Sequence, residues 1–269
     1  MANLIYHRRL VYSGMSKKYA KNFLKNVIFR LDFAQSLSTS KKSVNDFYEV
    51  IRNKFPKKED VATTIFEALV VGGKDSSIKQ SQKNIVNYKF SDETGEIVLM
   101  LESEPSNINL LITSYKNSDE LMTLINLIIS AIVKVYGDIV IKRTGLRYLN
   151  DIVLSEGNAL DWTSLIDSRL IFLLEFPADK RTISRGLGRI ELSKDSHKVL
   201  FQFGMHNPEY PNPIARKEFI LDYDCYVMDE ISAAEIPKLV KVLHEDAKDL
   251  FERSILDGLR EKMGLINDA

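Results

Sequence analysis

Cysteine and long hydrophobic runs are scarce in this sequence of 269 residues. A single thiol, that of Cys225, excludes an intramolecular disulfide and a zinc site with two or more thiolates. The longest apolar stretch, Leu121–Val135, is shorter than the roughly 20 residues that span a bilayer. Met1–Tyr12 is basic but lacks the hydrophobic region of a secretory signal. The sequence therefore predicts a soluble, cytoplasmic protein without a membrane partner.

Catalytic motifs are missing as well. The sequence has no nucleophile elbow, no Walker loop and no dinucleotide-binding glycine motif after a strand, and its four histidines lack metal-ligand spacing. We therefore predict no cofactor and favour a non-enzymatic protein. His206 precedes a proline-rich loop, a position that suits either a general base or an ordinary surface histidine. Cys225 shares the apolar face of its strand, which predicts a buried core position.

Acidic and basic residues balance over the whole chain, 37 of each, but not along it. Residues 1–58 contain thirteen Lys and Arg against three Asp and Glu, and residues 218–269 contain thirteen acidic against six basic residues. A nucleic acid can contact the basic segment through its lysines, namely Lys17, Lys18, Lys21, Lys25, Lys41 and Lys42. The alternative is that the two segments pack together and neutralise each other.

Hydrophobic periodicity divides the chain into two halves, residues 1–137 and 138–269. In the first half we expect strands at Asn26–Phe33, Ile85–Phe90, Glu96–Leu101 and Ile108–Thr113, helices at Ser43–Phe55 and Asp119–Val135, and a polar loop at residues 72–84. In the second half we expect strands at Ile139–Leu154, Ile183–Leu192, Val199–Phe203 and Phe219–Val227, helices at Trp162–Phe176 and about Ala234–Met263, and an extended loop at Asn207–Pro213.

Each half thus reads strand, helix, three strands, helix. This order predicts an α+β fold in which two pseudo-repeated halves form one compact unit, with antiparallel sheets packed on long helices. Helix-grip and TATA-binding-protein-like folds have such an order, and two unrelated α+β lobes are the alternative. Because Leu121–Val135 is apolar nearly all around a helix, we expect it to be buried within the chain or, alternatively, in a homodimer.

Several stretches together resemble one protein family. They are NFLKNVIFRLDF at Asn22–Phe33, NKFP at Asn53–Pro56, RTGLRYLNDI at Arg143–Ile152, FQFGMHNPEYPNPIARKEFILDYDCY at Phe201–Tyr226 and HEDAKDLFERSILDGLREKM at His244–Met263. The set is similar to a sporadically distributed prokaryotic family that has an R-x-G-x-R-Y-x-N-x-I strand, a closing F-E-x-S-I-x-x-x-L-R-E-x-M helix and no assigned biochemical activity. The resemblance implies a single module of the kind found among accessory or defence-associated genes, and it assigns no catalytic residue.

Charged residues alternate along three of the predicted strands. Arg143 and Arg147 share one strand face, at least about 7 Å apart, where guanidinium groups can hold a phosphate or a carboxylate. Arg30 occupies the matching strand of the first half, so the three arginines can face one groove. Asp222 and Asp224 also share a strand face, where they are either weak Mg²⁺ or Mn²⁺ ligands or ion-pair partners of Arg143 and Arg147.

The predicted binding surface combines the three arginines with neighbouring hydrogen-bonding residues, namely Tyr148, Asn150, His206, Asn207 and Tyr210. The first hypothesis is a non-enzymatic binding or regulatory protein that grips a partner protein or a small anionic ligand in a sheet groove. A nucleic-acid-binding protein is the second hypothesis. A metal-dependent hydrolase that uses Asp222 and Asp224 is the third.

Overall fold

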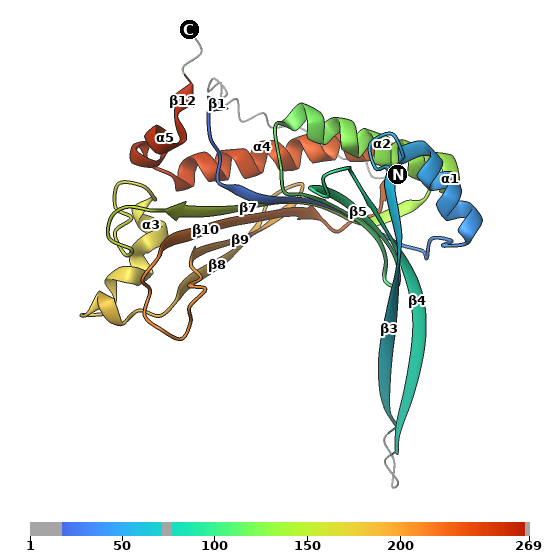
Figure 1. Cartoon of the computed structure of the whole chain (residues 1–269), viewed down its shortest axis with the longest axis horizontal. Helices are drawn as coiled ribbons and strands as arrows, with labels where there is room; N and C mark the ends of the chain where they lie inside the picture. The colour runs from blue at the N-terminus through green and yellow to red at the C-terminus, as the bar shows by residue number, and fades with distance from the viewer. Residues whose placement is uncertain (1–17, 72–76, 267–269) are drawn as a thin grey trace.

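A computed structural model describes residues 18–71 and 77–266, and Figure 1 shows its elements. The first half contains β1 (Lys18–Tyr19), β2 (Leu24–Phe33), β3 (Lys57–Val71), β4 (Ser77–Ser91), β5 (Ile97–Ser103), β6 (Ser106–Ile112), α1 (Lys41–Ile51) and α2 (Ser118–Tyr136). The second half contains β7 (Val140–Leu154), β8 (Gly186–Ser193), β9 (Lys198–Met205), β10 (Lys217–Val227), β11 (Ile231–Ser232), β12 (Leu265–Ile266), α3 (Ser168–Ile171), α4 (Ile236–Ser254) and α5 (Asp257–Met263).

One large antiparallel sheet organises the molecule. Nine strands follow one another in the order β3-β4-β5-β6-β2-β7-β10-β9-β8, and β11 pairs with the start of β7. The long helices α2 and α4 run along one face of this sheet (Figure 1). The alternating apolar residues of β2, such as Phe29 and Leu31, point toward that face and are fully buried. The predicted fold class, an α+β protein with antiparallel strands packed on long helices, is confirmed.

The two halves of the chain meet at β2 and β7, which pair antiparallel with Phe29 opposite Leu146. Outward from this pair, the order β6-β5-β4 on one side corresponds to β10-β9-β8 on the other. Helix α2 follows β6 in the chain as α4 follows the β10–β11 segment. The order of strands around the β2–β7 pair is therefore similar in the two halves, and a single sheet runs across the predicted boundary between residues 137 and 138.

The first half has two strands more than expected, the two-residue β1 and the long β3. β3 and β4 form a long hairpin whose pairing runs from Lys57 opposite Ser91 to Val71 opposite Ser77. The predicted polar loop at residues 72–84 is therefore wrong over residues 77–84, and residues 72–76 lie outside the described residues. Because each strand satisfies the other's backbone N–H and C=O groups, this polar segment forms a strand without an apolar face.

The second half lacks its first long helix, and the expected helix over Trp162–Phe176 is wrong. Ile166 is extended and pairs with Ile255 in an isolated β-bridge. Asp167 then caps the short α3 by accepting a hydrogen bond from the backbone N–H of Arg169, and a 3-10 turn follows at Phe172–Glu175. The same bridge ends α4 at Ser254, so the predicted final helix is divided into α4 and α5.

Helix α2 is buried within the chain, between the sheet, α1 and α4. Its N-terminus is capped by the side chain of Asn117, which accepts from the backbone N–H of Glu120, and its C-terminus ends at Gly137 with φ 78°. The buried side chains lie on one face of the helix and are Leu121, Leu124, Ile125, Ile128, Ile129, Ala131 and Ile132. This face of α2 is therefore buried within the chain, and Val133 on the remaining face is 45% exposed. None of the helices within the described residues is long and apolar enough to cross a membrane.

The short strands β1 and β12 pair beside α5, close to the C-terminal part of α4 (Figure 1). Beyond the strands, the backbone N–H groups of Ala20 and Lys21 donate to the carbonyl oxygens of Gly264 and Met263 over 3.0 and 2.9 Å. This pairing fixes Tyr19 and Met263 over the side of the sheet that carries the helices.

Candidate functional site

The sheet face opposite α2 and α4 carries a groove at its centre. Figure 1 shows the sheet arched, with the long helices on its outer side and the β3–β4 hairpin projecting from the other side. The groove has a volume of about 370 Å³ and is lined from β2, β6, β7 and β10 by Ile28, Arg30, Asp32, Asn109, Arg143, Gly145, Arg147 and Asp224. We call it the arginine groove. The structure thus brings Arg30, Arg143 and Arg147 together, as the strand alternation predicts.

Two ion pairs of unequal strength cross from β7 to β10 in the arginine groove. Arg147 Nε and Nη2 donate to Asp222 Oδ1 and Oδ2 over 2.7 and 2.6 Å, in a bidentate arrangement. Arg143 Nη2 makes a single hydrogen bond of 3.3 Å with Asp224 Oδ2. The alternative interpretation of the two aspartates, as partners of these arginines, is therefore confirmed.

The pKa shifts in the two ion pairs also indicate that Arg147 and Asp222 are held more firmly than Arg143 and Asp224. The hydrogen bonds that Arg147 donates to Asp222 raise the pKa of the Arg147 guanidinium, so this pair is fixed in its charged form. Burial raises the pKa of the Asp224 carboxyl, and the charges of Arg143 and Arg147 only partly offset that effect. The carboxylate of Asp224 is therefore the less firmly held of the two acceptors.

The absence of a side chain at Gly145 leaves space for the side chain of Arg143. A Cβ atom at position 145 would lie 2.8 Å from Arg143 Nη1, which is closer than side chains approach. The guanidinium lies over Gly145 and 5.2 Å from the centre of the Tyr226 ring. Across the strand pair, Arg30 lies opposite Gly145 and donates through Nε to Asp32 over 2.7 Å. The glycine thus lets two arginines from different strands approach the same part of the groove.

The weak metal candidates, Asp222 and Asp224, both face arginines. Among the residues that the structure describes, no group of three His, Cys, Asp or Glu side chains is placed to hold a metal ion. Cys225, next to Asp224, is fully buried on the helix side of the sheet, as predicted, and burial raises the pKa of its thiol well above the usual value.

The loop at residues 207–213 is ordered by its own contacts. Asn207 is 5% exposed and has a φ of 55°, and its Nδ2 donates to the carbonyl oxygens of Ser184 and Asn212, each over 2.8 Å. Arg185 lies over the Tyr210 ring at 4.1 Å and donates to the His206 carbonyl oxygen over 2.9 Å. Asn207 therefore has a structural role in the loop, and the side chains of His206 and Tyr210 are exposed on its surface.

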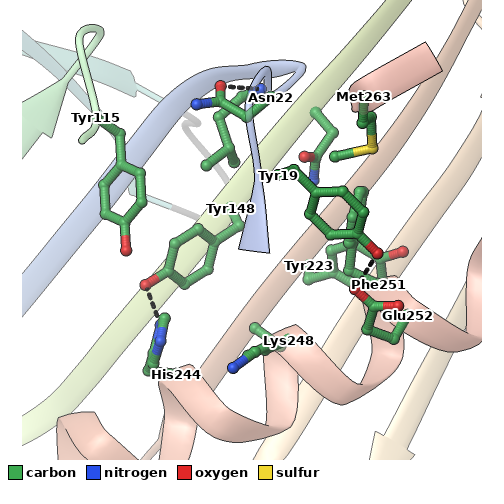
Figure 2. Close-up of a pocket in the computed structure, with 13 residues that line it drawn as sticks. Tyr19, Asn22, Tyr115, Tyr148, Tyr223, His244, Lys248, Phe251, Glu252 and Met263 are labelled. Atoms are coloured by element: carbon green, nitrogen blue, oxygen red, sulfur yellow. Dashed lines mark hydrogen bonds between the residues drawn. The ribbon is translucent and has the colours of Figure 1, made fainter. Parts of the chain in front are cut away.

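Tyr148 and Asn150 lie on the helix side of β7, away from the arginine groove. There they line a second cavity of about 190 Å³, shown in Figure 2. Its lining comes from β1, β2, β7, β10, α4, α5 and the segment before α2, and consists of Tyr19, Asn22, Leu24, Tyr115, Tyr148, Asn150, Tyr223, His244, Ala247, Lys248, Phe251, Glu252 and Met263. We call it the tyrosine pocket. The predicted binding residues thus occupy three separate places and do not form one site.

Hydrogen bonds fix several side chains of the tyrosine pocket. The Tyr148 hydroxyl and His244 Nδ1 are 2.7 Å apart, and the Tyr19 hydroxyl donates to Glu252 Oε1 over 2.7 Å (Figure 2). Burial raises the pKa of Tyr148 well above its usual value and lowers the pKa of His244. Both side chains are therefore uncharged at neutral pH.

Sequence reasoning missed most of this pocket. Tyr19, Tyr115 and His244 are far apart in the chain and carry no common spacing. The prediction grouped Tyr148 with the arginines, although the alternation of side chains along the strand puts Tyr148 on the face opposite Arg147. The tyrosines become neighbours only because β1 and α5 close over the same part of the sheet that α4 covers.

A comparison with protein-family models and a comparison with curated proteins each find no match for this chain. The family resemblance of the quoted sequence stretches therefore stays a prediction.

Proposed function

We propose that the protein is a non-enzymatic binding module that grips an extended segment of a partner protein in the arginine groove. The observation that supports the proposal is the loosely held pair of Arg143 and Asp224, 3.3 Å apart in an open groove. A carboxylate or carbonyl oxygen of a partner can replace Asp224 as the acceptor for Arg143 at little cost. Arg30, whose side chain is 38% exposed, offers further N–H donors beside it.

The charge of the groove favours a protein partner over a nucleic acid. The guanidinium groups of Arg30, Arg143 and Arg147 are each paired with an aspartate on the same face of the sheet. Binding to a phosphate backbone depends on uncompensated positive charge that releases counterions. A paired groove instead suits a polypeptide, whose carbonyl oxygens accept hydrogen bonds without carrying a full charge.

The lysines of the basic segment do not form one surface either. Lys18 lies on β1 and Lys41 on α1, and these elements are well separated along the long axis of the molecule (Figure 1). Lys25 pairs with Asp151 over 2.7 Å. Lys17 lies outside the described residues. The nucleic-acid hypothesis therefore gains no support from the arrangement of the described lysines.

The test is affinity capture of the tagged protein from its native host, with and without nuclease. We compare the wild type with the double variant Arg30→Gln and Arg143→Gln, and expect the variant to lose at least about tenfold in captured partner, which corresponds to one or two charge-assisted hydrogen bonds. Arg147 is left intact because its removal would leave the buried Asp222 without its cation. The matched control is Arg181→Gln, which removes a guanidinium whose side chain is 88% exposed.

A stoichiometric protein that survives nuclease treatment and is lost only in the double variant would support the groove assignment. Equal capture by the wild type and the double variant would show that the partner binds elsewhere. Captured material that disappears with nuclease or with moderate salt would replace the proposal with the nucleic-acid hypothesis.

A further inference from the structure

We propose that the tyrosine pocket binds a small, uncharged, planar nitrogen heterocycle that carries an N–H donor. The pocket lies on the opposite face of β7 from the arginine groove and shares no lining residue with it. This proposal therefore does not rest on the proposed function. Four features of the pocket carry it: its size, its aromatic walls, its charge and one hydrogen-bond acceptor on its wall.

The volume of the pocket sets the size of the ligand. The cavity measures about 190 Å³. A dry apolar cavity of about 150 Å³ holds one benzene molecule. The tyrosine pocket therefore accommodates one ring with a substituent or two fused rings.

Aromatic side chains form several of its walls. Tyr19, Tyr115, Tyr148, Tyr223 and Phe251 all line the pocket. Tyr115 and Tyr148 meet edge to face, with ring centres 6.0 Å apart and planes at 89°. Rings held in such geometry present both flat faces and edges to the cavity, and they favour a planar, aromatic guest over a branched aliphatic one.

The charged side chains that line the pocket already have interaction partners, which favours an uncharged guest. Lys248 and Glu252 are its lysine and its carboxylate, and both come from α4. Glu252 also accepts hydrogen bonds from Tyr19 and from Arg260, over 2.7 and 3.3 Å. A charged ligand loses its hydration when it enters the pocket. The charged groups of the pocket are already paired, so they do not compensate the ligand for that loss of free energy.

Asn150 supplies the hydrogen-bond acceptor of the tyrosine pocket. The residue is 4% exposed, and its Nδ2 donates to the Leu221 carbonyl oxygen over 3.2 Å. No residue in the described part of the chain donates to its Oδ1. This oxygen is not among the buried side-chain atoms that lack a hydrogen-bond partner, so it is accessible from the pocket that Asn150 lines. A ligand N–H that reaches it gains one hydrogen bond, worth about 0.5–1.5 kcal/mol, which is why the proposal requires a donor.

The experiment compares two probes of nearly identical shape, indole and benzofuran, by isothermal titration calorimetry on the whole protein. Indole has an N–H donor where benzofuran has an oxygen acceptor. We expect indole to bind and to raise the melting temperature, because it stabilises the native state alone. Benzofuran should bind about tenfold more weakly, the effect of one buried hydrogen bond.

Two variants locate the binding site. Tyr115→Leu removes an aromatic wall contributed by the loop before α2, so indole affinity should fall about tenfold while the protein stays folded. Asn150→Leu removes the acceptor, so indole and benzofuran should then bind equally. The matched control is Phe176→Leu, which replaces an aromatic ring that is 93% exposed and outside the pocket, and should leave indole affinity unchanged.

Each outcome decides the proposal. Indole binding that is stronger than benzofuran binding and is reduced by Tyr115→Leu supports it, even if Asn150→Leu fails to fold. Equal binding of the two probes to the wild type would overturn the donor requirement and leave a merely apolar cavity. No binding of either probe, or of adenine as a more polar heterocycle, would overturn the proposal. Capture by the arginine groove is measured separately, so failure of one proposal is distinguishable from failure of the other.

Discussion

The two faces of β7 provide opposite environments from alternate residues of one strand. Arg143 and Arg147 point into an open, polar groove whose charges are paired across strands. Tyr148 and Asn150 point the other way, into an aromatic pocket beside α4. The difference shows that one strand contributes to both cavities without conflict, because its side chains alternate with a period of two. Changes on one face should therefore leave the other face largely intact.

The largest effect on stability is expected for a substitution in the arginine groove. Arg147→Ala leaves Asp222, which is 4% exposed, without its bidentate cation. Removal of one partner from a buried ion pair costs about 3–5 kcal/mol, and we expect about 3 kcal/mol because the Arg147 side chain is 38% exposed. Urea denaturation measures the change. Arg143→Ala removes a single hydrogen bond of 3.3 Å to Asp224, in a pair whose side chains are 19% and 23% exposed. It is the matched control, with a loss of about 1.5 kcal/mol, the lower end for a hydrogen bond to a charged group, and equal losses would contradict the ranking of the two pairs.

A smaller effect is expected at Gly145. A Cβ atom at this position would lie 2.8 Å from Arg143 Nη1, so Gly145→Ala must displace the guanidinium. Because the side chain is flexible, the cost should be about 1 kcal/mol, at the lower end of that for overpacking. Thermal denaturation measures it. The same substitution in an Arg143→Ala background should cost less, and an unchanged cost would show that the backbone, not Arg143, limits the space.

On the pocket side, His244 makes stability depend on pH. Burial lowers the pKa of His244 below the 6.5 of an unfolded histidine, so the unfolded chain binds the extra proton more tightly. Stability should therefore fall as the pH drops below about 6.5, with a slope for this group of less than about 1.4 kcal/mol per pH unit. His244→Gln should flatten the wild-type curve between pH 5 and about 6.5. His206→Gln, at an exposed histidine, is the control, and equal slopes in all three proteins would contradict this assignment.

The smallest effect is expected far from both cavities. Phe176 is 93% exposed, so Phe176→Ser removes almost no contact. Its melting temperature and its free energy of unfolding should match those of the wild type to within about 0.5 kcal/mol. A larger loss of stability would show that the aromatic ring is covered in solution, for example by a second copy of the chain.

Much of the fold could be predicted because the decisive pattern is local. Val27, Phe29 and Leu31 alternate with polar residues, and β2 forms there with these side chains buried. The same alternation on β7 and β10 placed the arginines and aspartates of the groove on one side of the sheet. Along these strands the residue types alternate with the same period of two as the side chains of a strand, so the sequence indicates which face each residue occupies.

The errors arose where distant contacts override the local pattern. Trp162, Leu165 and Ile166 have helical spacing, but Ile166 pairs with Ile255, which is almost ninety positions away. The polar residues at the start of β4 gain their strand conformation from pairing with β3. The tyrosine pocket is the extreme case, because its walls come from segments throughout the chain. No local pattern identifies such a cavity, since tertiary packing creates it.

The pairing of β1 with β12 has a consequence for how the molecule is made. Lys18 leaves the ribosome long before its partner Ile266, and the sheet that lies between them in the sequence can pair while synthesis continues. The wall that Tyr19 and Met263 contribute to the tyrosine pocket therefore forms only after α5 has emerged. A ribosome-bound chain stalled before α5 should already contain the arginine groove, but its tyrosine pocket should lack this wall.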